Sequence, residues 1–147
     1  MEPCRELKFT SLSEVEKEIE RLGLEQPETT GNWTYFQILS HLADTIEDSF
    51  KPMDPPAKPV EARTTEVLFK RLQKSGKMKP GYVNPALPQT REHGDVEAAK
   101  QRLQKAIQGF RASTHLNHEP ALGYLNHEQF EFLHAIHSAM HLGFVKA

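Results

Sequence analysis

The sequence predicts an all-α fold: a four-helix bundle with a long proline-rich crossover and one short extra helix. Four stretches of the 147-residue chain place apolar residues at helical spacing behind a residue that favours a helix N-cap. No stretch alternates apolar and polar residues in the manner of a half-buried strand. Long connections separate the helical stretches, as in bundles with a crossover. A chain of this length predicts a single domain over residues 1–147.

The first two helices are expected over residues 11–24 and 34–50. In the first, Ser11 or Ser13 begins a capping box with the glutamate three positions later. In the second, Thr34 begins a capping box with a glutamine. The apolar stripes that these helices would bury are Leu12, Val15, Ile19 and Leu22 in the first, and Ile38, Leu39, Leu42, Ile46 and Phe50 in the second.

The middle of the chain is irregular apart from one short helix over residues 65–75. Four prolines between Lys51 and Pro59 exclude a continuous helix, so this segment is predicted to be an extended crossover. Residues 76–94 are irregular again and hold three prolines and three glycines. Connections of this length in a compact domain are often functional or cover a site.

The last two helices are expected over residues 95–114 and 127–145. Asp95 and Asn126 are the N-caps. With the first two helices they complete four amphipathic helices, which is the pattern of a four-helix bundle.

Composition excludes several classes of function. Apolar residues make up 37% of the chain and charged residues 26%, with a net charge of −2 and no run of like charge, so neither nucleic acid nor a membrane is the expected partner. The single cysteine, Cys4, excludes an internal disulfide and fits a reducing compartment. No apolar run reaches ~18 residues, and residues 1–30 lack the apolar segment of a signal peptide. A cytoplasmic protein is therefore expected.

Histidines are the unusual feature of the composition. Eight are present, three of them in the segment FLHAIHSAMHLGF, and no CxxCH motif for haem attachment is found. His137 and His141 lie four residues apart, which places them on one helix face with Cβ atoms ~5–6 Å apart. Two imidazoles so placed can bind one metal ion at ~2.0–2.1 Å. The spacing is that of HExxH, but HSAMH lacks the glutamate, so a zincin protease is excluded.

His41 is the best third ligand, because it is the only histidine in the upstream helices. Three histidines that leave coordination positions open describe a catalytic rather than a structural site. Two alternatives remain. The histidines are a pair at the surface or in the core whose hydrogen bonds other groups satisfy, or they form a row of polar side chains between helices that fixes helix register without metal. Three roles are open for His134: a fourth metal ligand, a residue that hydrogen-bonds to a ligand, or a polar residue at the rim of the site. The last two are favoured. Asp44 either orients His41 or belongs to a solvated face, which is favoured. The other histidines are expected at the surface: His93, His115, His118 and His127.

Two stretches, NWTYFQILSHLADTIEDSF and LNHEQFEFLHAIHSAMHLGF, resemble the DinB/YfiT-like metalloenzyme superfamily, in particular a small branch of unknown function. FKRLQKSGKMKPG together with the later LPQT is also similar to that branch. The resemblance implies a bundle of up-down-down-up topology in which His41, His137 and His141 hold a divalent metal ion, nickel, zinc or similar. Several members are S-transferases or isomerases that use low-molecular-weight thiols, and dimers are common among them.

The expected function is that of a divalent-metal-binding DinB-like protein, a metal-dependent enzyme of the thiol-dependent S-transferase or hydrolase type. An open position on the metal would bind a thiol and stabilise its thiolate, or activate a water. Its partners would be a small-molecule substrate, a low-molecular-weight thiol among the candidates, and a second copy in a homodimer. The alternative is a non-enzymatic bundle that binds metal or a small ligand, since no catalytic acid, base or nucleophile is identified beside the histidines.

Overall fold

The computed structural model describes residues 3–23, 25–80 and 90–147, and these ranges are helical and contain no strand. The helices are α1 (Leu12–Leu22), α2 (Tyr35–Asp48), α3 (Ala62–Ser75), α4 (Val96–Ala112) and α5 (His127–Leu142). The all-α prediction is confirmed. The extra helix α3 begins three residues earlier than predicted and has 14 residues, as many as α2. Leu24, the predicted end of the first helix, and residues 81–89, which hold most of LPQT, lie outside the described residues.

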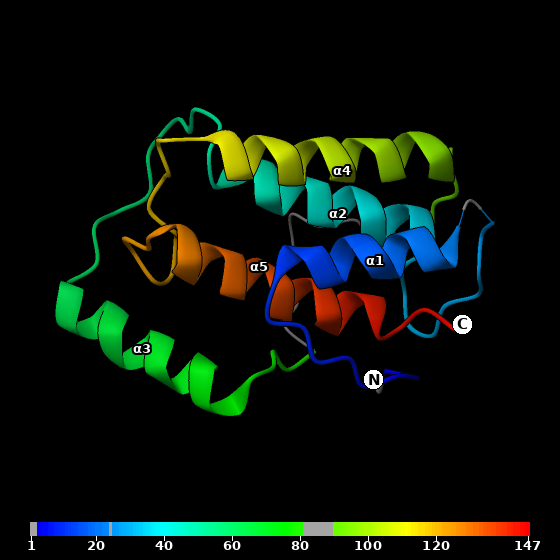
Figure 1. Cartoon of the computed structure of the whole chain (residues 1–147), viewed down its shortest axis with the longest axis horizontal. Helices are drawn as coiled ribbons and strands as arrows, with labels where there is room; N and C mark the ends of the chain where they lie inside the picture. Colours follow the sequence, from blue (N-terminus) through cyan, green and yellow to red (C-terminus); the bar gives the residue numbers. More distant parts are fainter. Residues whose placement is uncertain (1–2, 24, 81–89) are drawn as a thin grey trace.

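Four helices pack as a bundle and α3 lies apart from it (Figure 1). The colours in Figure 1 show that α1 and α5 run from left to right, whereas α2 and α4 run from right to left. The helix pairs in closest contact are α2 with α4, α1 with α5, α2 with α5 and α1 with α4. In this arrangement α2 and α5 are antiparallel neighbours, so a residue on one can meet a residue far away in sequence on the other.

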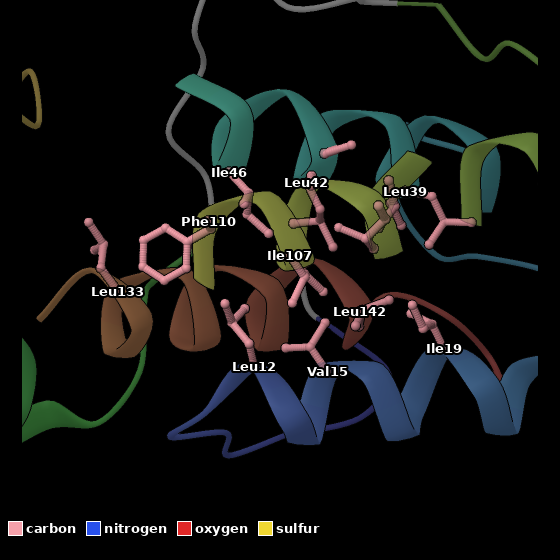
Figure 2. Packing of buried hydrophobic residues seen from close by; sticks show 14 of the residues in the cluster. Leu12, Val15, Ile19, Leu39, Leu42, Ile46, Ile107, Phe110, Leu133 and Leu142 are labelled. Atoms are coloured by element: carbon pink, nitrogen blue, oxygen red, sulfur yellow. The ribbon is translucent and has the colours of Figure 1, made fainter. Parts of the chain in front are cut away.

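The core lies between the four bundle helices (Figure 2). It consists of aliphatic and aromatic side chains that repeat at helical spacing, and each contributes ~1.5–3 kcal/mol when fully buried. The completely or almost completely buried members include Leu12, Val15 and Ile19 of α1, Leu39, Leu42 and Ile46 of α2, Leu103, Ile107 and Phe110 of α4, and Ile136 and Leu142 of α5. The apolar stripes predicted for the first two helices are confirmed apart from Leu22 and Phe50, which are only partly buried.

The helix N-termini follow the sequence with one exception. Thr34 forms the predicted capping box at the start of α2, and Asn126 forms one at the start of α5. No capping box forms at α1, where the Ser11 side chain caps no backbone N–H. There the N–H of Leu12 donates instead to the carboxylate of Glu131 on α5, 3.0 Å away. A tertiary contact therefore replaces the local cap.

The helix α3 is attached to the bundle at a few points. Phe69 is 4% exposed and its ring meets Phe132 of α5 at 5.8 Å between centroids. The hydroxyl of Thr65 donates to the carbonyl of Leu122. Gly123 follows that carbonyl with φ of 84°, and a Cβ there would lie 2.7 Å from Val60, so this contact requires glycine.

The segment before α1 fastens the end of α5. The guanidinium of Arg5 donates from Nε to the carbonyl of Val145 at 2.8 Å and from Nη2 to that of Leu142 at 3.0 Å. Its Nη1 pairs with Glu18 of α1 at 2.7 Å. These bonds join the N-terminal segment to the last residue of α5 and to the chain that follows it.

Replacement of Arg5 by alanine is expected to lower the free energy of unfolding by about 2 kcal/mol. Each hydrogen bond to a charged group is worth ~1.5–3 kcal/mol, but the loss is smaller than the sum for three because the Arg5 side chain is 20% exposed and water replaces part of these contacts. Urea unfolding measures the change. Lys8→Ala, at an exposed position in the same segment, is the control and should change the value by less than ~0.5 kcal/mol. Equal free energies of unfolding for the two variants would show that the Arg5 contacts do not contribute to stability.

No helix in the described ranges is both long enough and apolar enough to cross a membrane.

Candidate metal centre

Three of the eight histidines meet between α2 and α5. His41 lies in the middle of α2, and His137 and His141 lie one turn apart near the end of α5. The antiparallel packing of these helices brings His41 to the α5 pair, as the sequence predicted. One ring nitrogen of each residue lies within 4.8 Å of the others.

The Nε2 atoms of the three rings point toward one another. Nε2 of His137 lies 3.2 Å from that of His41 and 3.1 Å from that of His141. The rings meet edge to face, with centroids 4.6–5.0 Å apart. Edge-to-face contact also occurs between apolar rings, so the distinctive feature of this cluster is that the Nε2 atoms lie close together.

Burial keeps these imidazoles neutral. It lowers the pKa of His141 to about 3, with a further contribution from the charge of His41. Burial, and then the charges of the neighbouring histidines, hold the pKa of His137 well below its ordinary value. The pKa of His41 is also lowered by burial, against the opposing charge of Asp44. At neutral pH each ring therefore carries one N–H and one lone pair.

Three neutral rings cannot satisfy this geometry by hydrogen bonding alone. Nε2 of His137 faces two other nitrogens but can either donate one proton or accept through one lone pair. Nε2 of His137 can therefore form a good hydrogen bond with only one of its two neighbours. The other neighbour lacks a partner there, and a buried polar atom without a partner costs ~1–3 kcal/mol of stability. A cation at the centre would accept all three lone pairs at once.

Trp33 forms one wall of the cluster. Its ring stacks on His141 with 5.2 Å between centroids and meets the edge of His41 at 4.9 Å. The chain just before it is held to the end of α5, where Thr30 N–H donates to the carbonyl of Phe144 at 2.8 Å. No role at the site was predicted for Trp33 from the sequence. The signal that could have indicated one is its position directly before the helix that carries His41.

The cluster lines a pocket of about 820 Å³, which is within the ~300–1,000 Å³ of small-molecule sites. Most of the lining side chains are apolar. The connections on both sides of α3 take part, through Met53 on one side and Met78 to Pro80 on the other. Leu72 of α3 completes this outer wall. The sequence predicted long connections near the site but could not place them.

His134 lies away from the cluster, so the alternative of a fourth ligand is excluded by the geometry. Its Nε2 lies 3.0 Å from Oγ of Ser49, the residue directly after α2. Its ring packs between Phe110 and Phe130, and the residue is 2% exposed. The prediction of a polar residue at the rim is wrong, since His134 is among the most buried polar groups. Burial lowers its pKa to about 3.

Asp44 belongs to the solvated face that the sequence favoured. It is exposed and forms an ion pair with Arg102 of α4, which also pairs with Glu47 at 2.7 Å. The surface placement of the remaining histidines is confirmed for His93, His115 and His118, which are exposed. It is wrong for His127, which is half-buried: its ring packs on Phe110 and its Nε2 donates to the carbonyl of Ser113.

Comparison with known proteins identifies a family without naming a reaction. A family model described as "Protein of unknown function (DUF1569)" matches residues 1–147. No curated protein and no solved structure matches the sequence. The chemistry of the site must therefore be argued from its own residues.

Proposed function

Since the chain belongs to the DUF1569 family, to which no function is assigned, we propose that it is a divalent-metal-binding protein whose three-histidine centre is His41, His137 and His141. The single observation that carries this proposal is the convergence of three Nε2 atoms at 3.1–3.2 Å between partners, at the wall of a large pocket. The likeness of the two motif helices to the DinB/YfiT-like superfamily supports the same ligand set.

The spacing of the nitrogens fits a first-row metal ion. With bonds of ~2.0–2.1 Å and angles between those of octahedral and tetrahedral coordination, ligand nitrogens lie roughly 2.9–3.4 Å apart. The separations of 3.1 and 3.2 Å fall inside this range. The rings are already in the neutral form that binds metal. Imidazole ligands suit zinc, nickel, copper and iron, so the donor set does not select one of them.

The pocket supports a metal-dependent enzyme of the thiol-dependent S-transferase or hydrolase type. A divalent ion held by three histidines supplies a Lewis acid that lowers the pKa of a thiol or water bound at an open position. The chain's own residues bind and shield the substrate: Trp33 covers the cluster on one side, and Met140 and Phe144 line the pocket beside it. A low-molecular-weight thiol and a small electrophile are the proposed substrates, and the protein is proposed to act in the cytoplasm as a homodimer.

A non-enzymatic metal- or ligand-binding bundle is the second candidate. One observation favours it. Burial lowers the pKa of His134, His137 and His141, so these side chains are neutral and weakly basic. Such rings hold a metal well but are poor general bases near pH 7.

Thermal unfolding tests the metal proposal. Protein loaded with one equivalent of zinc or nickel is expected to melt well above the same protein in chelator, because an ion that binds only the native state stabilises it by ~4 kcal/mol at a thousand times its Kd. His115→Ala, at an exposed site, should show the same gain. Identical melting temperatures with metal and with chelator would refute the proposal and favour the histidines as a polar seam.

A thiol-transfer screen separates the enzyme from the binding protein. Metal-loaded protein is incubated with low-molecular-weight thiols and electrophiles, and turnover is expected for at least one pair. The turnover should disappear in His41→Ala and persist in His115→Ala. Metal that binds stoichiometrically without turnover of any thiol or hydrolysable substrate would favour the non-enzymatic bundle.

A further inference from the structure

The pocket has a second polar region beyond the metal centre. Along α2, its lining residues Ile38, His41, Thr45 and Asp48 recur every three or four positions, so one face of the helix lines it throughout. The seven residues from His41 to Asp48 correspond to ~10 Å along the axis. On the antiparallel α5, His134 lies one turn from His137 in the same direction. The second region therefore lies roughly 5–10 Å from the metal centre.

His134 presents a hydrogen-bond acceptor there. The hydroxyl of Ser49 donates to the carbonyl of Ile46, so its oxygen accepts from the Nε2–H of His134 at 3.0 Å. This bond fixes the tautomer and leaves a lone pair on Nδ1. Within the described ranges no group donates to Nδ1, although the residue is 2% exposed and lines the pocket. An acceptor at the pocket wall can take a hydrogen bond from a ligand N–H or O–H, which contributes ~0.5–1.5 kcal/mol.

Asp48, which is exposed and lines the same pocket, adds a negative charge. It is the last residue of α2, where the helix dipole is already negative and where no basic residue occupies the final turn. Its acidic neighbours are compensated, Asp44 by Arg102 and Glu47 by Arg102 and Lys51. Of the lysines and arginines that the structure describes, none forms an ion pair with Asp48, including Lys79 of the pocket wall. Desolvation and then the charges of Asp44 and Glu47 raise the pKa of Asp48, against the opposing charge of Arg102.

Apolar side chains form much of the rest of the pocket wall. Leu133 and Met140 of α5 and Leu72 of α3 line it together with Met53 of the crossover. The carboxylate of Glu119, at the same end, already accepts from the N–H groups of Ala121 and Leu122 and is less available to a ligand.

We propose that His134 and Asp48 form an amine subsite, and that the substrate is an elongated, mainly apolar molecule with a metal-binding group at one end and a protonated amine roughly 5–10 Å away. The amine donates one proton to Nδ1 of His134 and pairs with the carboxylate of Asp48. The metal-binding half of this description rests on the proposed function, whereas the amine subsite is made by the chain alone.

Binding of paired probes tests the subsite. Zinc-loaded protein is titrated calorimetrically with ω-aminoalkanethiols from cysteamine upward, and with the alkanethiol and the ω-mercaptocarboxylate of each length. At the length that spans both regions, the amine is expected to bind about tenfold more tightly than the alkanethiol, the effect of one charge-assisted hydrogen bond. The mercaptocarboxylate should bind more weakly than both. Asp48→Asn should abolish the preference, whereas Asp44→Asn, one turn away and outside the pocket lining, should keep it.

The outcomes separate the two proposals. If thiols bind the zinc-loaded protein but amine, methyl and carboxylate ends bind equally, the amine subsite is wrong and the metal centre stands. If no metal binds, the metal centre is wrong, and the subsite is tested on the metal-free protein with n-alkylamines against n-alkanols of equal length. A preference for the amine that Asp48→Asn removes then supports the subsite, and equal binding overturns it.

Nitrogen-15 NMR of the metal-free protein tests the role of His134 directly. The ring is expected to be protonated at Nε2 and unprotonated at Nδ1. The Nδ1 resonance should move on addition of an n-alkylamine but not of an ether of matching length, which has no hydrogen-bond donor. A ring protonated at Nδ1, or one whose resonances ignore the amine, would overturn the assignment.

Discussion

His137→Ala is expected to lose at least a hundredfold in affinity for zinc or nickel and to show no rise in melting temperature on metal addition. His137 is the central member of the cluster, since its Nε2 faces both other nitrogens at 3.1–3.2 Å. Without it the two remaining imidazoles lose the shared centre, and a site of two ligands on different helices binds far more weakly than one of three. Isothermal titration of the chelator-treated protein measures the affinity.

The matched control for this variant is His134→Gln. Position 134 is one turn earlier on α5 and is buried like position 137, but its side chain bonds to Ser49 instead of the cluster. It should keep the metal affinity of the wild type. Loss of affinity in both variants would indicate that metal binding depends on the packing of α5 as a whole and not on the ligand set.

Acidification is expected to destabilise the metal-free protein steeply between pH 7 and pH 5. Burial lowers the pKa of His134 and His141 to about 3 and that of His137 well below its ordinary value. The unfolded chain takes up these protons near pH 6.5, but the folded chain does not take them up until far lower pH. Because the unfolded state binds more protons in this window, the free energy of unfolding falls by ~1.4 kcal/mol per pH unit for each histidine below pH 6.5. Urea unfolding in the presence of chelator measures the slope.

His134→Gln again provides the comparison. It removes one of the buried titrating groups while keeping a donor for Ser49, so the slope should decrease by the contribution of one proton. His115→Ala removes an exposed histidine and should leave the slope unchanged. A free energy of unfolding that does not change between pH 7 and pH 5 would show that the buried rings are hydrated or protonated in the folded state.

Local sequence features predicted the helices of the fold. Features that depend on contacts between helices could not be predicted from them. The caps at Thr34 and Asn126 depend on side chains three residues apart and were predicted correctly. The start of α1 was not, because the N–H of Leu12 finds its partner in Glu131, 119 residues later.

In the candidate site, too, local spacing was predictable and contacts between helices were not. The spacing of His137 and His141 is local and predicted their shared face, and the apolar stripe of α2 predicted that His41 would meet them. The role of His134 was missed, because the same spacing fits a ligand, a neighbour of ligands and a buried partner of Ser49. Only the packing of the end of α2 against the middle of α5 distinguishes these. The pocket wall from α3 and its flanking segments was equally invisible, since their apolar residues are sparse and not periodic.

X-ray absorption spectroscopy of the zinc-loaded protein tests the central claim most directly. One zinc ion per chain is expected to remain after dialysis, with a first shell of three imidazole nitrogens at ~2.0–2.1 Å and further light atoms that exchange for sulfur when a thiol is added. His41→Ala should lose one imidazole from that shell or lose the metal altogether. A protein that retains no zinc after dialysis, or whose zinc has fewer than two imidazole ligands in the wild type, would contradict the three-histidine centre.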